Sequence, residues 1–210
     1  MDHFKALLGS RYFIWATLAL PSIPLLIQLL TGISDGSGLS EQQAREIREP
    51  AGTFAAIALS LALLMTPIYQ LRNSTFIRWL LARRRYFGVA CFSYATVHMA
   101  LYLVALESTA EFIRELGQFE IILGWLFFFI IVPLGLTSNQ VSMRLLGRKW
   151  KGLQRAAYVV AVLVLVHWTV VHGPMPALIF FVPLAVLEAI RLWRLWKATR
   201  LRRSGPVVAG

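Results

Sequence analysis

Cysteine and charge are both scarce in this sequence. The chain has 210 residues but a single cysteine, Cys91, which excludes a disulfide framework and a metal site built from several thiolates. Only 15% of the residues are charged and 58% are hydrophobic, whereas a soluble domain usually carries about 25% charged residues. The composition therefore indicates a membrane protein, in which Cys91 is expected to be a small buried apolar residue.

The motifs of several enzyme classes are also missing. The sequence contains no Walker loop, no Gly-x-Gly-x-x-Gly pattern and no nucleophile elbow. No apolar run contains a pair of carboxylates that could act as acid and base. These absences argue against phosphate binding by a glycine-rich loop and against hydrolysis.

Long apolar runs dominate what is present. A helix that spans a bilayer needs about 20 apolar residues. Six runs of roughly this length occur, at residues 12–31, 51–71, 86–106, 119–137, 153–172 and 175–196. The first run is too long for the core of a signal peptide and ends without a clear small-x-small cleavage pattern. The sequence therefore predicts an all-α, polytopic bundle of six transmembrane helices that forms one domain over residues 1–210.

The connections between these runs alternate in charge. Lys and Arg near the ends of spans favour the cytoplasmic side. The basic segments carry Lys5, Arg11, Arg72, Arg78, Arg83, Arg84, Arg85, Arg144, Arg148, Lys149, Lys151, Arg155, Arg191, Arg194, Lys197, Arg200, Arg202 and Arg203. The opposite segments carry Asp35, Glu41, Glu46, Glu49, Glu107, Glu111, Glu115 and Glu120, with only Arg45, Arg48 and Arg114 among them. Both termini are therefore expected in the cytoplasm.

The net charge of +11 does not indicate nucleic-acid binding. Such binding needs the basic residues on one soluble face, and here they are divided among segments that separate the apolar runs. The charge instead reflects topology and contact with the anionic headgroups of the lipid bilayer.

Two of the acidic connections carry local signals. Ser40 and Gln43 fit a capping box, and the polar residues that follow predict a short interfacial helix that Pro50 ends. Met175 and Pro176, preceded by Gly173 and Pro174, predict a tight turn between the last two spans.

Histidines are the ionisable residues that lie clearly inside the spans, where they are costly and count as functional candidates. His98 follows Arg85 by 13 residues, and His167 follows Gly152 by 15. At ~1.5 Å per residue, both rings lie ~20 Å from the inner boundary. Two level histidines on parallel helices predict a clamp for one planar metal group. Alternatively, each histidine hydrogen-bonds a neighbouring helix and has no ligand.

Glu188, in the last span, has Arg191 and Arg194 about one helical turn away. This spacing predicts a local helical ion pair at the inner boundary rather than a proton site.

Haem suits the histidine clamp better than zinc does. Zinc asks for three or four ligands, and no Asp, Glu or Cys lies at this depth. Haem accepts two axial imidazoles within an apolar, aromatic surrounding. The aromatic residues that could supply it are Phe92, Tyr94, Tyr102, Trp125, Phe127, Phe128, Phe129 and Trp168. The same stripe is also typical of plain packing, but together with the clamp it favours a carrier of electrons across the membrane.

Two stretches carry a family resemblance. Residues 83–103 read RRRYFGVACFSYATVHMALYL, and residues 135–168 read GLTSNQVSMRLLGRKWKGLQRAAYVVAVLVLVHW. Together they resemble the haem-binding membrane subunit of the periplasmic protein-methionine-sulfoxide reductase system, a family in the ferric-reductase-like transmembrane group. The resemblance runs from about Pro50 to Trp168. It implies a multi-pass cytochrome b of the bacterial inner membrane that takes electrons from a cytoplasmic flavin system or quinol and passes them to a periplasmic molybdopterin reductase.

The resemblance also implies haem ligands, and the chain departs from it at one of them. Family ligand positions match His98 and His167, but a third family histidine, in a Leu-His motif, is replaced here by Gln154. Gln154 lies 13 residues before His167, ~20 Å nearer the cytoplasm, where its amide is a poor ligand for a second, inner haem. His3 and His172 are weak replacements. His172 is turned about 140° from His167 on the helix and is expected to mark the outer surface.

One haem b is therefore predicted, and the inner half of the membrane needs another carrier. A flavin (FMN) or a quinone bound among Arg84, Arg85, Arg148 and Arg155 would supply it, and the same arginines could hold haem propionates through charge-assisted bonds. The alternative interpretation is that these arginines only set the topology and bind no ligand. Two alternatives stay open for the whole protein: a single-haem reductase with another donor or acceptor, such as a quinone or a ferric chelate, and a non-redox membrane scaffold or transporter.

Overall fold

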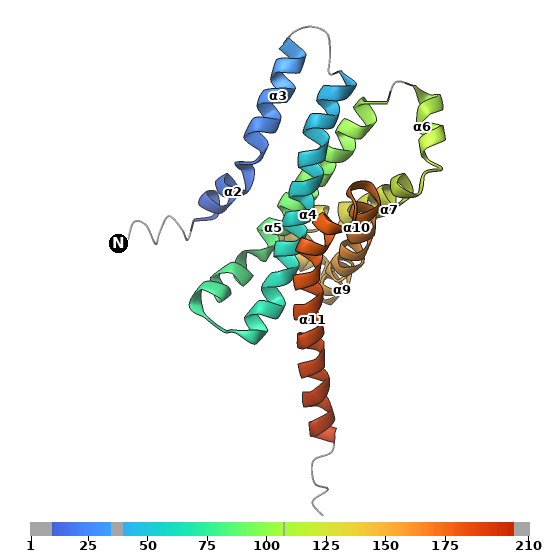
Figure 1. The fold of residues 1–210 in the computed structure, drawn as a ribbon. Helices are drawn as coiled ribbons and strands as arrows, with labels where there is room; N and C mark the ends of the chain where they lie inside the picture. Colours follow the sequence, from blue (N-terminus) through green and yellow to red (C-terminus); the bar gives the residue numbers. More distant parts are fainter. Residues whose placement is uncertain (1–9, 35–39, 107, 204–210) are drawn as a thin grey trace, which may run out of the picture.

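The computed structural model describes residues 10–34, 40–106 and 108–203, and every regular element in them is a helix (Figure 1). The helices are α2 (Arg11–Ala19), α3 (Ser22–Ser34), α4 (Glu41–Leu71), α5 (Thr75–Val104), α6 (Thr109–Glu115), α7 (Phe119–Leu136), α8 (Gln140–Leu146), α9 (Arg148–Gln154), α10 (Ala157–His172) and α11 (Pro174–Arg203). Five stretches are long and apolar enough to span a bilayer, and the bent pair α2–α3 would make a sixth. The prediction of an all-α membrane bundle is confirmed.

Helix α4 begins ten residues before the start expected for the second span. The predicted capping box is present: Ser40 Oγ accepts from the Gln43 N–H, and the Gln43 side chain accepts from the Ser40 N–H. The helix that it starts, however, continues through Pro50 to Leu71. The prediction of a separate interfacial helix that Pro50 ends is therefore wrong.

A continuous buried stripe explains why α4 continues past Pro50. A proline inside a helix costs ~3 kcal/mol, since it removes a hydrogen bond and crowds the preceding turn. Ala44 and Ile47 before the proline, and Ala51 and Ala55 after it, are all at most 5% exposed. Their spacing of three or four residues keeps them on one face of the helix. Burial of this face on both sides of Pro50 offsets the cost of the proline.

The first predicted span is bent rather than continuous. Helices α2 and α3 meet at an angle of 53°. The bend lies at Leu20 and Pro21, which separate the two helices. Because Pro21 has no N–H to donate to the carbonyl of Thr17, the hydrogen-bond ladder is interrupted at this point.

Helices α4 and α5 are joined by only three residues, 72–74. The Ser74 side chain caps α5 by accepting from the Ile77 N–H at 3.2 Å. As a result, α5 starts at Thr75. Arg72 stays in the connection as predicted, whereas Arg78, Arg83, Arg84 and Arg85, which were also expected there, lie on the helix itself. Arg83 shows how such a side chain is held, since its guanidinium lies 4.4 Å from the centre of the Trp79 ring and donates to the Trp79 carbonyl.

Two glycines with positive φ make the other tight connections. Gly147 (φ 50°) joins α8 to α9, and Gly173 (φ 81°) joins α10 to α11, in a backbone region that favours glycine. Pro174 follows as the first residue of α11, a position that suits proline because no helical N–H is needed there. The predicted tight connection between the last two spans is present, but it lies at Gly173, and Met175 and Pro176 belong to the first turn of α11.

Helices α4 and α5 form the centre of the bundle. Helix α4 packs against α3, α10 and α11, and α5 packs against α2 and α7. The buried core includes Cys91, as expected from its apolar setting, with Leu59, Val160 and Phe181. Outside the core, apolar side chains of the spans point outward; Phe129, for instance, is 67% exposed. Such a surface suits contact with lipid.

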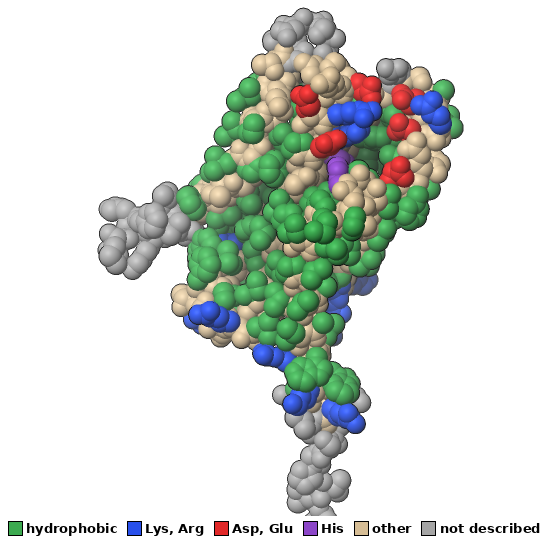
Figure 2. All heavy atoms as spheres, in the orientation of Figure 1, with side chains coloured by type: hydrophobic (Ala, Val, Ile, Leu, Met, Phe, Trp, Pro, Cys, Tyr) green, Lys and Arg blue, Asp and Glu red, His purple; other side chains and the backbone are tan. Residues whose placement is uncertain are grey.

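Charge divides the bundle into two ends (Figure 2). The acidic end carries the start of α4, α6 and the start of α7, and Figure 2 shows acidic side chains gathered there above a hollow in which a histidine is visible. Lys and Arg side chains occupy the opposite, basic end, around the C-terminal part of α11. Of the charges that predict orientation, Lys5, Asp35 and Glu107 lie outside the described residues.

Candidate functional site

A cavity of about 300 Å³ opens at the acidic end of the bundle. Its walls come from α4, α5, α7 and α10, and both His98 and His167 line it. A second cavity of about 50 Å³ shares these two histidines and continues between small or apolar side chains that include Ala55, Ala56 and Leu59 of α4. The structure therefore brings the two histidines together from α5 and α10, where a larger cavity with many charged lining residues meets a smaller apolar one.

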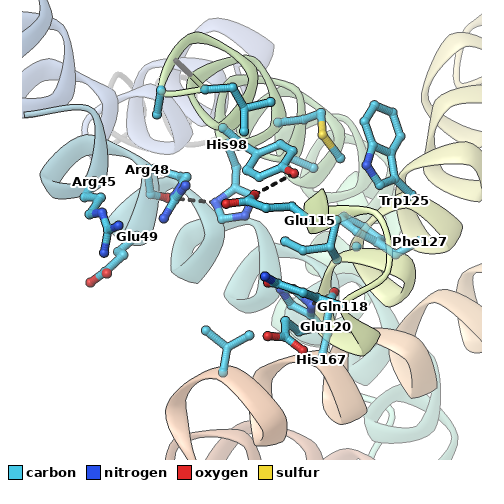
Figure 3. Close-up of a pocket in the computed structure, with 18 of the residues that line it drawn as sticks. Arg45, Arg48, Glu49, His98, Glu115, Gln118, Glu120, Trp125, Phe127 and His167 are labelled. Carbon is cyan, nitrogen blue, oxygen red and sulfur yellow. Dashed lines mark hydrogen bonds between the residues drawn. The ribbon is translucent and has the colours of Figure 1, made fainter. Parts of the chain in front are cut away.

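His98 is half-buried and is held by the neighbouring helix α4. Its Nδ1 lies 2.8 Å from the backbone carbonyl oxygen of Arg48 (Figure 3). A carbonyl can only accept, so this hydrogen bond requires the proton to be on Nδ1. The other ring nitrogen, Nε2, then keeps its lone pair, which is the form of histidine that binds a metal.

His167 is held in the same way by a different helix. Its Nδ1 lies 2.9 Å from the carbonyl oxygen of Glu120, at the start of α7. The same reasoning places the proton on Nδ1 and leaves Nε2 as a free donor of an electron pair. Carbonyls of two different helices thus hold two imidazoles of one cavity in the tautomer that can bind a metal through Nε2.

The donor set limits which metal group would fit. Among the residues that the structure describes, no group of three or more His, Cys, Asp or Glu side chains could hold a metal ion. Zinc would need such a set, whereas haem brings four ring nitrogens of its own and asks the protein for two axial ligands. Two prepared imidazoles on an apolar cavity therefore fit haem.

The mouth of the cavity is polar. Glu49, Glu111 and Glu120 line it together with Arg48. The Tyr102 hydroxyl donates to Glu115 Oε2 at 2.9 Å and so connects the end of α5 with α6 (Figure 3). The entrance is therefore charged, whereas the smaller inner cavity is mainly apolar.

His172 also lines both cavities, although its side chain is exposed. The helical angle predicts that it turns away from His167, but the structure shows both residues lining the same two cavities. His172 therefore lies at the rim of the site, at the surface of the acidic end. His3, the fourth histidine, lies outside the described residues.

The Gln154 side chain hydrogen-bonds the C-terminal end of the neighbouring helix α7. Its Nε2 donates to the Leu134 carbonyl at 3.1 Å and to Thr137 Oγ1 at 3.3 Å. Trp150 binds the same end of α7, since its Nε1 donates to the Thr137 carbonyl at 2.9 Å. These bonds add to those of the Ser138 and Thr137 hydroxyls, which also donate to the Leu134 carbonyl at the C-terminal end of α7. Gln154 thus acts as a cap between α9 and α7.

The four arginines proposed for an inner ligand have different surroundings. Arg84 donates to Thr66 Oγ1 of α4 at 2.8 Å, whereas Arg85 approaches Met143 Sδ of α8 at 3.6 Å. Arg148 and Arg155 are exposed at the two ends of α9. Neither of the histidine-lined cavities includes any of the four.

Glu188 forms the predicted ion pair. Its Oε2 lies 2.9 Å from Arg191 Nη1, one helical turn further along α11. The prediction that Glu188 takes part in a local ion pair is confirmed.

Sequence reasoning missed the residues that hold the histidines from outside. These are the carbonyls of Arg48 and Glu120, and the glycines Gly52 and Gly124, each of which lies beside one imidazole ring. No motif could have shown them, because every residue has a carbonyl and only tertiary packing selects the one that meets a histidine.

Comparison with known proteins identifies the family. The model of the family described as ferric reductase like transmembrane component matches residues 51–165. The chain belongs to this family of ferric-reductase-like membrane proteins. The predicted family membership is confirmed, and the chain is a multi-pass transmembrane protein.

Curated relatives of this ferric-reductase-like chain are haem-binding subunits called MsrQ. The chain is 30% identical to the protein-methionine-sulfoxide reductase heme-binding subunit MsrQ of Ralstonia nicotianae, over 98% of this chain and 94% of that protein. It is also 30% identical to the MsrQ subunit of Brucella anthropi, over 91% of this chain and 85% of that protein. No solved structure matches the chain.

Proposed function

We propose that this chain is a membrane cytochrome b that holds one haem b between α5 and α10 through His98 and His167. It carries electrons from a cytoplasmic flavin or quinol donor to a periplasmic molybdopterin reductase that acts on methionine sulfoxide. One observation carries the proposal: both histidines line the same cavity, and each gives Nδ1 to a backbone carbonyl, which leaves its Nε2 lone pair free. The names of the MsrQ relatives support haem binding and the link to methionine sulfoxide.

The protein's own residues supply binding, orientation and exclusion of water. When bound, haem supplies a reversible one-electron change at its iron. His98 and His167 would hold that iron through Nε2, and the carbonyls of Arg48 and Glu120 fix the tautomer and raise the basicity of each ring. The side chains of Ala55 and Leu59 keep the inner wall dry, so the surroundings and the ligands together set the potential.

The orientation follows from the distribution of charge. We place the basic end in the cytoplasm and the acidic end at the periplasmic face, because Lys and Arg near span ends favour the cytoplasm. The histidine-lined cavity opens at the acidic end and is then on the side of the periplasmic partner. In the bacterial inner membrane, the cytoplasmic half is bridged by a quinone or a flavin near the arginines of the basic end, which suit phosphate or carboxylate groups.

A spectrum of the purified protein tests the haem proposal. We expect a b-type reduced-minus-oxidised signal, and we expect the periplasmic molybdoenzyme with methionine sulfoxide to reoxidise the reduced protein. Reoxidation by a ferric chelate alone would favour the other reductase function. A protein that stays colourless after reconstitution with excess haem would reject both redox functions.

The number of haems tests the role given to Gln154. Replacing Gln154 with alanine is expected to cost ~0.5–1.5 kcal/mol of unfolding free energy, because its hydrogen bonds to the Leu134 carbonyl and the Thr137 hydroxyl are lost while the Ser138 hydroxyl still donates to that carbonyl at 2.7 Å. The haem content is expected to stay at one per chain, since the side chain acts as a cap and not as a ligand. Pyridine haemochrome analysis measures the haem content, and unfolding in detergent measures the stability.

Gln140 provides the control for this experiment. It is exposed at the start of α8, and its replacement with alanine is expected to change neither stability nor haem content. Two haems per chain in the unmodified protein, falling to one in the Gln154→Ala variant, would show that Gln154 supports an inner haem.

A further inference from the structure

The two cavity histidines are seated by the same local arrangement, which occurs twice in the bundle. His98 meets the carbonyl of Arg48 on α4, and the residue four positions after Arg48 is Gly52. His167 meets the carbonyl of Glu120 on α7, and the residue four positions after Glu120 is Gly124. In both cases the glycine lies directly beside the imidazole ring.

Helix geometry explains why glycine stands at this spacing. A helical side chain leans towards the N-terminus and covers the turn before its own Cα. The side chain four residues after a carbonyl therefore tends to cover that carbonyl. Glycine has no side chain, so the oxygen stays accessible to a second donor and the ring can lie against the backbone.

The distances show how little space is left at the first glycine. A Cβ added to Gly52 would lie 2.8 Å from His98 Nδ1 and 2.9 Å from His98 Cε1. These separations are too short for a real contact, so the His98 ring would have to move. At Gly124, the nearest atom to an added Cβ is His167 Cε1 at 3.6 Å, which is ordinary van der Waals contact.

We propose that Gly52 and Gly124 are positioning residues for the axial ligands. Each leaves one carbonyl open to an imidazole Nδ1–H: at Gly52 there is no room for a Cβ, whereas at Gly124 there is room for a Cβ but not for a branched side chain. The arrangement is tight at His98 and looser at His167. This inference rests on the proposed haem function, because only that function makes the two imidazole rings ligands.

The test compares single substitutions whose outcomes should differ. Gly52→Ala is expected to displace the His98 ring, lose most of the bound haem and shift the low-temperature electron paramagnetic resonance signal of any haem that remains. Gly124→Ala is expected to keep one haem per chain with an unchanged signal. Gly124→Val, which adds two further carbons, is expected to perturb the signal as Gly52→Ala does.

Gly88 supplies the matched control. It lies on α5, the helix of His98, and a Cβ there would meet nothing within 4 Å. Gly88→Ala is therefore expected to bind haem as the unmodified protein does. An equal loss of haem in Gly88→Ala and Gly52→Ala would overturn the inference, since it would show a general intolerance of substitution.

A second measurement, on haem-free protein, covers the case in which Gly52→Ala folds poorly. If the added Cβ meets the His98 ring, Gly52→Ala should destabilise the unmodified protein but have almost no effect in a His98→Ala background, where the ring is absent. Equal destabilisation in both backgrounds would overturn the inference.

The controls also separate this inference from the proposed function. Unmodified protein that binds no haem would reject the proposed function and the inference with it. Unmodified protein with one haem, together with a Gly52→Ala variant of normal haem content and signal, would reject only the positioning role.

Discussion

Replacing His98 or His167 with alanine is expected to remove the b-type spectrum of this protein. Each substitution deletes one axial nitrogen from the cavity that both residues line. Loss of an outer partner of a metal ligand alone typically costs roughly 10- to 100-fold in affinity, so loss of the ligand itself should cost at least as much. Haem per chain, measured by pyridine haemochrome, is expected to fall to near zero in both variants.

The His172→Ala variant decides whether the ligands are correctly assigned. His172 lines the same cavities but lies at their rim, and its replacement is expected to leave one haem per chain. Loss of haem in His172→Ala, with retention in His167→Ala, would show that His172 is the ligand on α10. Retention of haem in both His98→Ala and His167→Ala would contradict the clamp.

The sequence was sufficient to place the two histidines at the same level. Apolar runs, helical rise and the positions of Arg85 and Gly152 predict that His98 and His167 lie at equal depth, and the structure shows both on one cavity. This works because depth in a membrane depends on chain length along a helix, which a sequence contains directly. Their role as haem ligands stays a prediction.

Contacts between helices could not be predicted in the same way. The carbonyl that each histidine meets depends on which helix lies beside it and on its rotation, and neither quantity is encoded by a local pattern. Pro50 is a second case in which tertiary packing decides the outcome and the local sequence does not. Its local chemistry predicts the end of a helix, but burial of Ala51 and Ile47 on either side of it keeps α4 continuous.

Gln154 also needed the structure for its interpretation. Comparison with the family pattern shows only that a histidine is absent at this position. The structure adds what the residue does, since its amide donates to the Leu134 carbonyl and to the Thr137 hydroxyl. An amide can cap a helix end, because it has two N–H donors, and this role makes the glutamine useful where an imidazole is absent.

Removing Arg191 is expected to be the most destabilising change away from the cavity. Arg191 pairs with Glu188 on α11 at 2.9 Å, and its guanidinium also donates to Gln70 of α4 and to the Tyr158 hydroxyl of α10. It therefore connects three helices. The Arg191 and Glu188 side chains are only 21% and 14% exposed, so Arg191→Ala leaves a largely buried carboxylate without its partner.

The expected cost of Arg191→Ala is about 3 kcal/mol of unfolding free energy, at the lower end of the range for breaking a buried pair. Unfolding of the protein in mixed micelles measures it. Arg194, an exposed arginine one turn further along α11, provides the control, and Arg194→Ala is expected to change stability by less than ~0.5 kcal/mol.

The double variant Glu188→Gln/Arg191→Gln separates the ion pair from general packing. It removes both charges, so that no carboxylate is left without a partner, and it should cost less than Arg191→Ala alone because the two sites are coupled. A double variant that loses as much stability as the sum of its single variants would show that the pair does not act as a unit. An Arg191→Ala variant no less stable than Arg194→Ala would show that the connection between the three helices contributes nothing.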